Sequence, residues 1–425
     1  MLQRLVVVLT IFLAIFADGC SRYAQDCAIM DARCNAAIFA LAFRRLTESR
    51  FAYVAVTAGT IYEYSVSRTN GTLTQIGTVP GAGAGATALT MDPQSRFLFA
   101  VSATATNVSS YTINSRTGAL SLVGTYTVGA GAVQAAVDPL GRYLYVSDST
   151  TTTVHMFSID QTTGALTGIA GGTFTVLTGP QIPAFDSFGR YAYISTNSVP
   201  RVNLLNILSD GSLSNIAAAI TPGASPLQGS IDPLNHALYV PNNGAGTISM
   251  YTIGSDGSLN SLGTVSPGGA PSTLTIDPTG RFLYTRTGTA NIWMYSIDQT
   301  TYALAPIGGG TIASGTNPRM LSIHPSGRFA YAPDQSTATL YMYSIDQTTG
   351  ALTALSGTSR ATGGTATAGC AFDAPGSYLY QADGGGSTIS QYYVDSSSGQ
   401  LWSQGVLTAA ATPRGPLAMA NYNTY

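Results

Sequence analysis

The sequence has 425 residues, of which only 9% are charged, and all 18 basic residues are arginine because the chain contains no lysine. The missing lysine excludes Schiff-base chemistry, a lysine general base and a P-loop. A formal net charge of −2 without a basic stripe argues against nucleic acid as a partner. The 47 glycines and the many short apolar runs are typical of an all-β protein rich in turns.

The N-terminus has the composition of a signal peptide. One arginine precedes an apolar run over residues 5–16, which is too short for a stable membrane anchor, and small residues follow as far as Cys20. The pair Gly19-Cys20 resembles the cleavage site of bacterial lipoproteins, in which the cysteine becomes lipidated. We therefore predict a signal peptide over residues 1–19 and a lipid anchor at Cys20, with ordinary secretory cleavage and an unmodified Cys20 as the alternative.

The predicted destination is outside the bacterial cytoplasm, either as a cell-envelope or outer-membrane lipoprotein or as an extracellular protein. Residues 20–48 are expected to form a tether, because the apolar run 35–46 ends in two arginines and suits a short helix between membrane and globular part. A linker that packs loosely on the domain is the alternative. An export compartment permits a disulfide between Cys27 and Cys34, although not within one straight helix, where seven residues rise about 10 Å.

The globular region is a repeat that begins near Ser49. A turn of the form DPxGR precedes an aromatic and aliphatic strand, as in "VDPLGRYLYV" at Asp138, and the first residue of this turn stands at positions 92, 138, 186, 232, 277, 324 and 373. Between successive turns lie four strand-like runs, which near Asp138 read "AVQAAV", "YLYVSD", "TVHMFSI" and "ALTGIAG". A period of about 46 residues with four strands is typical of a β-propeller blade.

A second marker gives the number of blades. A Gly-x-Leu hairpin precedes each fourth strand, and the glycine position is occupied in chain order by Gly71, Gly118, Gly164, Gly211, Gly257, Tyr302, Gly350 and Gly399. Eight hairpins against seven turns are explained if the strand after Ser49 belongs to a blade whose first strand is "PRGPLAMAN" near the C-terminus. Such pairing leaves no open sheet edge. We predict an eight-bladed propeller over residues 49–425, with seven blades as the alternative.

The sequence resembles a known family. The turn "DPxGRxLYV" followed by "GTISMYTI" and "SDGSLNSLG" is similar to the lactonase-type β-propellers, which include 6-phosphogluconolactonase-like and carboxymuconate-cyclising proteins, and to the YVTN-type surface repeats. The resemblance covers nearly everything after residue 49 and implies a propeller, of seven blades in the lactonase-type proteins. For enzymes of the family it also implies a histidine at the channel, five residues before the turn aspartate, with help from arginine and glutamate.

The residues expected for such an enzyme are missing. The seven places five residues before the turn hold Thr87, Val133, Gln181, Leu227, Ser272, Arg319 and Ala368. Of the two glutamates, Glu48 precedes the propeller and Glu63 lies on a third strand, while His155, His236 and His324 fall on a third strand and in turns. No metal site, cofactor or catalytic set is predicted from this inventory. Activity as an enzyme is therefore left open.

The strand order predicts two distinct faces. Because successive strands alternate in direction, the DPxGR turns and the hairpins before fourth strands share one face, here called the first face. On it, the turn arginines are expected to pair with the hairpin aspartates Asp160, Asp298 and Asp346. The loops after second and fourth strands form the second face. The thrice-written hairpin "SIDQTTGALT" is thus interpreted as scaffold, and a ligand is expected on the second face.

The second face collects the remaining charged and polar side chains. First strands line the channel, so the best candidates to meet a ligand at its mouth are Arg319, Arg414 and Gln181. Further ligand-binding candidates in the loops are Arg201, Arg286, Asp148, Asp334 and Asp383. Arginine offers a planar pair of donors to carboxylate, sulfate or phosphate groups. The alternative is that these residues are solvated or join neighbouring blades.

The sequence supports two functions. The first is a lipid-anchored binding or scaffold module at the cell envelope, whose partners would be the membrane through its lipid anchor and an anionic small molecule, a glycan, or an envelope or host protein. The alternative is a lactonase or cyclase for a small acidic sugar lactone, as in 6-phosphogluconolactonase-like proteins, or for a muconate-type substrate, with Arg319 holding the carboxylate. A purely structural envelope protein is a third hypothesis.

Overall fold

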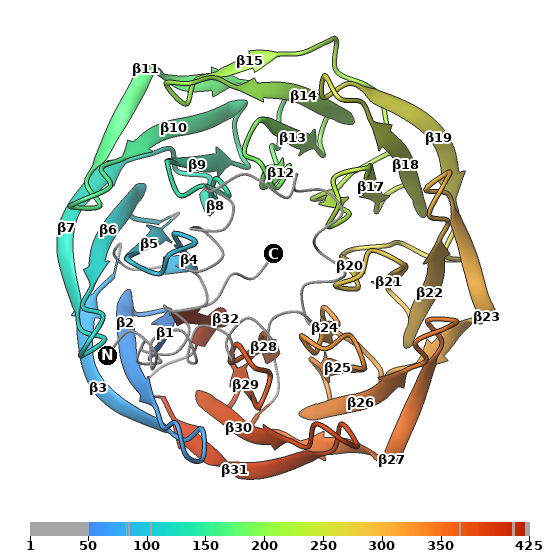
Figure 1. Ribbon diagram of the computed structural model, residues 1–425. Helices are drawn as coiled ribbons and strands as arrows, with labels where there is room; N and C mark the ends of the chain where they lie inside the picture. Colours follow the sequence, from blue (N-terminus) through green and yellow to red (C-terminus); the bar gives the residue numbers. More distant parts are fainter. Residues whose placement is uncertain are drawn as a thin grey trace, which may run out of the picture. The chain divides into compact units, whose positions relative to one another are not determined.

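The computed structural model describes residues 51–81, 83, 86–102, 104–364, 367–409 and 413–420. These residues form 32 strands in eight four-stranded antiparallel sheets, arranged as blades around a central channel (Figure 1). The predicted all-β fold and the eight blades are therefore confirmed. The predicted signal peptide, the lipidation site Cys20, the cysteines Cys27 and Cys34 and the tether lie outside the described residues.

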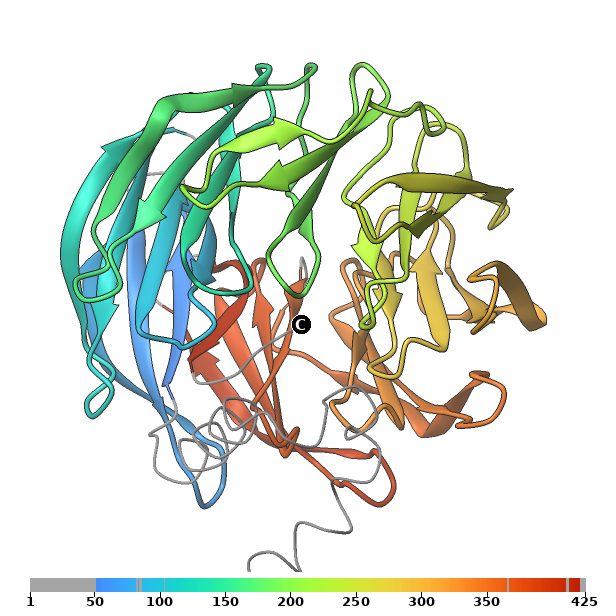
Figure 2. The same cartoon turned by 45° about the horizontal axis from the view of Figure 1, so that its top comes forward.

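In each blade the four strands lie side by side from the channel to the periphery, as the view in Figure 2 also shows. The innermost strands of blades 1 to 8 are β32 (Pro413–Ala420), β4 (Ala86–Met91), β8 (Ala132–Val137), β12 (Ala184–Phe185), β16 (Ser230–Ile231), β20 (Leu274–Ile276), β24 (Ser322–Ile323) and β28 (Thr367–Phe372). The second strands are β1 (Phe51–Val56), β5 (Phe97–Ser102), β9 (Tyr143–Asp148), β13 (Tyr191–Thr196), β17 (Ala237–Asn242), β21 (Phe282–Arg286), β25 (Phe329–Asp334) and β29 (Tyr378–Asp383).

The two outer layers complete the blades. The third strands are β2 (Thr60–Val66), β6 (Asn107–Ile113), β10 (Thr153–Ile159), β14 (Arg201–Ile207), β18 (Thr247–Ile253), β22 (Asn291–Ile297), β26 (Thr339–Ile345) and β30 (Thr388–Val394). The outermost strands are β3 (Leu73–Pro80), β7 (Leu120–Thr127), β11 (Leu166–Thr175), β15 (Leu213–Asn215), β19 (Leu259–Val265), β23 (Leu304–Ala313), β27 (Leu352–Ala361) and β31 (Leu401–Thr408). No helix long and apolar enough to cross a membrane occurs among the described residues.

The ring closes as the hairpin count predicts. Strand β32 pairs antiparallel with β1, with Phe51 opposite Ala420 and Val56 opposite Pro413. The C-terminal strand therefore supplies the innermost strand of the blade that begins the chain's repeat. The hydrophobic core lies between neighbouring blades, because second strands such as β1 and β9 are buried along their whole length. Removing these apolar faces from water is the main stabilising contribution to such a fold.

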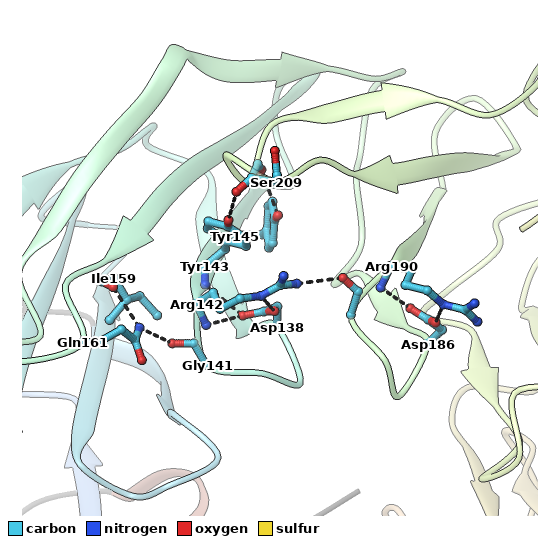
Figure 3. A network of polar contacts seen from close by, with 12 residues as sticks. Asp138, Gly141, Arg142, Tyr143, Tyr145, Ile159, Gln161, Asp186, Arg190 and Ser209 are labelled. Carbon is cyan, nitrogen blue, oxygen red and sulfur yellow. Dashed lines mark hydrogen bonds and ion pairs between the residues drawn. The ribbon is translucent and has the colours of Figure 1, made fainter. Parts of the chain in front are cut away.

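The DPxGR turn is a structural element. In blade 3, Asp138 is fully buried, and its Oδ1 accepts hydrogen bonds from the backbone N–H groups of Arg142 and Tyr143 (Figure 3). Its Oδ2 pairs with Arg142 Nε at 2.9 Å, and Arg142 Nη2 donates to the carbonyl of Gly189 in the next blade's turn at 2.8 Å. The buried carboxylate is thus fully compensated, which a buried charge requires.

The expected pairing of turn arginines with hairpin aspartates is wrong. Arg96 forms an ion pair with Asp92 of its own turn and donates to the side-chain and backbone oxygens of Gln161 in the hairpin of the following blade. Arg281 likewise reaches the carbonyl of Gln347. The turn aspartate is buried and precedes the arginine by only four residues. The guanidinium therefore pairs with this carboxylate and not with the exposed carboxylate of the hairpin. These contacts place turns and hairpins on one face, as expected.

The repeated hairpin joins blades through its glycine. In seven blades the tyrosine of the second strand donates its hydroxyl to the carbonyl at this glycine position of the next blade, as Tyr284 does to Gly350 at 2.8 Å. Blade 2 has Phe99 instead, and Ser110 donates to Gly164 there. The peptide written three times in the sequence therefore connects neighbouring blades, which agrees with its interpretation as scaffold.

Candidate functional site

Two arginines lie side by side across the boundary between blades 6 and 7. Arg286 is the last residue of β21, and its Nη1 donates to the carbonyl of Pro318 at 2.9 Å. The residue after Pro318, Arg319, donates its backbone N–H to the carbonyl of Pro333 at 2.7 Å, which places it alongside β25 in blade 7. The innermost strands of these two blades, β20 and β24, surround the central channel with those of the other blades (Figure 1).

The electrostatics of this pair are unusual. Burial, and then the charge of Arg319, lower the pKa of Arg286 below its ordinary value. Both Nε atoms are buried without a hydrogen-bond partner, and among the described residues neither guanidinium forms an ion pair with a carboxylate. An unsatisfied buried donor costs about 1–3 kcal/mol. The site therefore combines two positive charges with Nε donors that have no acceptor among the described residues.

A serine lies next to the arginines. Ser272 donates its backbone N–H to the carbonyl of Arg286 at 3.2 Å, and its Oγ is also buried without a partner. Sequence reasoning placed Ser272 at the channel but did not select it. Arg286 stands out in the repeat because the residues at the same position of the second strand in blades 5 and 7, Pro241 and Pro333, carry no charge. An arginine there brings a charge to a position that is uncharged in those blades.

Among the described residues, none of the three candidate aspartates forms an ion pair with these arginines, although Asp334 pairs through its backbone with Pro318, the residue before Arg319. Asp148, Asp334 and Asp383 each end a second strand in a different blade, where they are buried and bonded to their own surroundings. Asp148 Oδ1 accepts from the N–H and the hydroxyl of Thr150. Asp383 accepts from Gln381 Nε2 and from the hydroxyls of Thr388 and Ser390. These contacts show that they organise their own loops.

The same position gives opposite pKa shifts in two blades. Burial tends to raise the pKa of Asp334, but backbone N–H groups of Asn317, Ser336 and Thr337 donate to its carboxylate and hold its pKa below the ordinary value. Burial raises the pKa of Asp383, and the hydrogen bonds from Ser390 and its neighbours oppose this without reversing it. The backbone donors therefore make Asp334 the more firmly ionised of the two.

Of the remaining candidates, Gln181 and Arg201 form hydrogen bonds with nearby backbone groups, and the side chain of Arg414 is not described. Gln181 donates from Nε2 to the carbonyl of Gly179, and its own carbonyl accepts from Ser147, which joins blades 3 and 4. Arg201 begins β14 and donates to the carbonyl of its neighbour Pro200 at 2.7 Å. Arg414 lies on β32 opposite Ala55, and its side chain is outside the described residues.

Glu63 and His155, which could act as acids or bases, form hydrogen bonds within the propeller. Glu63 is buried, its Oε1 accepts from the N–H of Leu120 in the next blade at 2.8 Å, and burial raises its pKa. His155 accepts from the N–H of Gly129 through Nε2, and burial lowers its pKa below the ordinary value. In the described part of the chain, no group of three His, Cys, Asp or Glu residues is placed to hold a metal ion.

An open depression of about 540 Å³ lies on the outer side of blades 3 and 4, away from the arginines. It is lined by Thr175, Val176, Leu177, Asn203, Asn215, Ala217, Ala218 and Ala219. None of these side chains is charged or able to act as an acid or base near neutral pH. The depression therefore offers no charged group to a ligand.

Comparison with protein families gives one clear match. A family model described as "Lactonase, 7-bladed beta-propeller" matches residues 18–136, 130–313 and 287–417. A search of curated protein sequences found no match. The matched family is described with seven blades, whereas this chain forms eight.

Solved structures share the fold at low sequence identity. A putative 6-phosphogluconolactonase from Bacteroides uniformis has 18% identity and a TM-score of 0.60, over 74% of this chain and 97% of that one. The periplasmic gluconolactonase PpgL of Pseudomonas aeruginosa has 16% identity and a TM-score of 0.61, over 89% and 100%. Apo AztD from Citrobacter koseri has 12% identity and a TM-score of 0.63, over 89% and 100%. At these identities the likeness shows the fold alone.

Proposed function

The chain belongs to the lactonase family of β-propellers, and from this premise we propose that it is a binding module for small anionic ligands at the cell envelope. The proposed binding site is the pair Arg286 and Arg319. The proposal includes export and anchoring through a lipidated Cys20, as the N-terminal sequence predicts. The ligand class is a small molecule with a carboxylate or phosphate group, free or as part of a glycan.

The observation that carries the proposal is the uncompensated charge of the two arginines. Like charges that are partly desolvated repel each other, and in the part of the chain that the structure describes both Nε donors lack an acceptor. One bound carboxylate or phosphate would remove both penalties, because its oxygens accept paired N–H bonds from guanidinium groups in a fixed geometry. Sites of this kind favour anions over neutral sugars, since a hydroxyl cannot balance the two charges.

The composition of the site argues against hydrolysis. Ring opening of a lactone by water needs a general base within hydrogen-bond reach of the water. Arg319 occupies one of the seven places at which the family resemblance implies a histidine, and none of the seven holds one. Arginine stays protonated and cannot accept a proton at neutral pH. Glu63 and His155 lie in blades 1 and 3 and are bonded within the scaffold. A binding role needs no such base.

The second candidate function is that of a lactonase. Two structural neighbours carry the names 6-phosphogluconolactonase, as a putative assignment, and periplasmic gluconolactonase, and this likeness of fold is what favours it. In that case the substrate would be a small acidic sugar lactone or a muconate-type lactone. Arg319 would hold its carboxylate or phosphate group.

Titration calorimetry with gluconate and 6-phosphogluconate tests the binding module. We expect binding to the wild type that falls at least tenfold in Arg319→Ala and in Arg286→Ala. Arg319→Lys should keep the charge but lose part of the affinity, because lysine cannot donate two parallel bonds. The matched control is Arg116→Ala, which removes an exposed arginine of a first-face hairpin and should leave binding unchanged.

Two results would overturn this assignment. One is that neither anion binds, or that binding survives in both alanine variants. The other is turnover of lactones such as 6-phosphogluconolactone that is lost in a folded Arg319→Ala protein, which would establish the lactonase. The anchor is tested separately by mass spectrometry, since Cys20→Ser should remove the acyl mass and release the protein from membranes.

A further inference from the structure

The seven DPxGR turns of blades 2 to 8 form a rim on the first face, opposite the arginine pair. Each turn connects an innermost strand to a second strand, and neighbouring turns touch. Ser187 donates its N–H to the side-chain oxygen of Asn235 in the next turn at 2.7 Å, and Asn235 Nδ2 returns a bond to Ser187. A Cβ on Gly280 would lie 3.2 Å from Pro233 of the preceding turn. The rim is therefore one connected surface.

One sector of this rim is apolar. The third residue of each turn points to solvent, and in blades 3, 4 and 5 it is Leu140, Phe188 and Leu234, with 46%, 59% and 58% of the side chain exposed. We call these three residues the apolar arc. The equivalent residues in the other turns are Gln94, Thr279, Ser326 and Pro375. Three large apolar side chains on adjacent turns form a patch of the kind that marks interaction sites.

The three residues are brought together by the turn contacts. A Cβ placed on Gly189, next to Phe188, would lie 3.5 Å from Leu140 Cγ. Leu234 and Phe188 flank the bonded pair Ser187 and Asn235. The arc thus lies on three neighbouring turns, with the Arg142 guanidinium at Gly189 and the Arg190 guanidinium over the Phe188 ring.

The surroundings of the arc are acidic. The tyrosines of these blades hold the adjacent hairpins through bonds from Tyr143 to Ser209 and from Tyr191 to Ser255. Each hairpin carries an exposed aspartate, and the third belongs to the hairpin that Tyr239 holds through Tyr302. The three aspartates are Asp210, Asp256 and Asp298. Hydrogen bonds from hydroxyl and backbone donors of Ser212, Ser258, Thr300 and Thr301 lower the pKa of these carboxyls and keep them ionised.

The basic groups nearby do not reverse this charge. Arg142 is paired with Asp138, and Arg190 is paired with Asp186 while its guanidinium stacks on Phe188 at 4.9 Å. The third turn has His236 beside Asp232. Each arginine is therefore matched by a buried aspartate, and the three hairpin carboxylates leave the sector with a net negative charge.

From the arc and its charge we propose that this sector of the first face is a docking surface for a protein segment with large apolar side chains flanked by arginine or lysine. The apolar residues of the segment would cover Leu140, Phe188 and Leu234, and burial contributes about 25 cal/mol for each Å² removed from water. Its basic residues would face the three hairpin carboxylates, which raises the association rate and sets the orientation. The surface is independent of the arginine site on the second face.

A peptide-binding measurement on the full-length protein tests this surface. The probe is a fluorescent 12-residue peptide of leucine and arginine, with a twin in which every arginine is glutamate. We expect the basic peptide to bind and the acidic twin to bind at least tenfold more weakly. The combined variant Leu140→Ser, Phe188→Ser and Leu234→Ser should lose at least tenfold in affinity and keep its thermal midpoint, because these side chains are exposed.

Two further variants make the measurement specific. Leu122→Ser with Trp402→Ser removes large apolar side chains that are equally exposed on outer strands, and it should leave binding unchanged. Changing Asp210, Asp256 and Asp298 to asparagine should weaken binding and reduce its dependence on salt. Asparagine keeps the turn, because Asn114 already caps the equivalent hairpin of blade 2.

The proposal is overturned if the triple serine variant binds the basic peptide as the wild type does, or if both peptides bind equally. It is also overturned if the serine variant changes only self-association, measured by light scattering, or only binding to phosphatidylcholine vesicles. Those results would assign the arc to a second copy of the chain or to a lipid surface. Anion binding at Arg286 and Arg319 should persist in every one of these variants.

Discussion

At the boundary between blades 5 and 6, the large side chain of Tyr302 packs in one cluster with the small side chain of Ala237, the reverse of the arrangement at the other boundaries. At the other blade boundaries a hairpin glycine faces an aromatic ring that begins the preceding blade's second strand, as Gly118 faces Phe51 and Gly350 faces Phe282. Here the hairpin residue is the tyrosine and the second strand begins with the alanine. Tyr302 packs in the cluster that contains Ala237, although its φ of 60° is unfavourable for a non-glycine residue.

This exchange predicts a strong coupling between the two positions. Tyr302→Gly should cost about 1–2 kcal/mol, because the lost packing exceeds the relief of a positive φ. Ala237→Phe alone should cost about 1–3 kcal/mol by overpacking against the tyrosine. The double variant recreates the arrangement of the other blades and should approach wild-type stability. Urea unfolding of the four proteins measures the coupling, and simple additivity of the two changes would contradict it.

The glycine of the repeated hairpin predicts a second outcome. Gly350 has a φ of 76°, and a Cβ there would lie 2.2 Å from the ring of Phe282. Gly350→Ala should therefore lower the free energy of unfolding by about 2–4 kcal/mol, the sum of left-handed strain and a steric clash. The control is Gly288→Ala, since no atom lies within 4 Å of a Cβ there and its φ is not positive. Equal stability of the two variants in thermal unfolding would refute this account.

His324 predicts a pH dependence of stability. It replaces the turn aspartate in blade 7, where Nε2 donates to the carbonyl of Gly376 at 2.9 Å and Nδ1 accepts from Ser326. Burial lowers its pKa below the ordinary value of 6.5. The folded protein then binds fewer protons than the unfolded chain below that pH, so the stabilisation is complete above about pH 6.5 and declines as the pH falls further.

The variant His324→Asp tests this dependence. The aspartate should accept from the backbone of the turn and pair with Arg328, as Asp138 does with Arg142. Its pKa would then be lowered, so its contribution would decline only below about pH 4. We expect urea midpoints at pH 7 and pH 5 to differ less in the variant than in the wild type. His155, whose pKa burial also lowers, should retain part of the slope.

The closing strand predicts an effect of truncation. A chain that ends before Pro413 lacks β32, which exposes the edge of β1 and removes Met419 from the core cluster with Ala52 and Val54. We expect loss of cooperative unfolding and aggregation through the open edge. A synthetic peptide of residues 413–420 should restore part of the thermal midpoint. A chain that ends at Ala420 is the control, and similar behaviour of the two truncated proteins would contradict the role of β32.

The fold could be predicted because the same sequence motifs recur in nearly every blade. The turn and the hairpin are two markers in the same period, and their unequal counts indicated both the eighth blade and the strand that completes it. The turn marker contains aspartate, proline and glycine, and the hairpin marker contains glycine, at positions where the backbone geometry favours these residues. Such local requirements are visible in a sequence without knowledge of long-range contacts.

The candidate site was predicted only in part, because its decisive features depend on which atoms meet. Arg286 and Arg319 were both selected, but their contact arises from a hydrogen bond across a blade boundary. Asp148, Asp334 and Asp383 looked like free carboxylates, and only the structure shows how donors such as Thr150 and Thr388 occupy them. The turn arginines were assigned to the wrong aspartates, since burial of Asp92 could not be read from its sequence neighbours.

Because β32 comes from the C-terminal end of the described chain, the blade that contains β1 can be completed only after the other blades have been synthesised. Strands β1, β2 and β3 leave the ribosome first, yet the innermost strand of their blade follows after the seven other blades have been synthesised. Bringing such distant segments together carries the largest loop-closure entropy in the molecule. The first blade to be translated is therefore the last to be completed, and until then the growing chain is an open arc with one unfinished end.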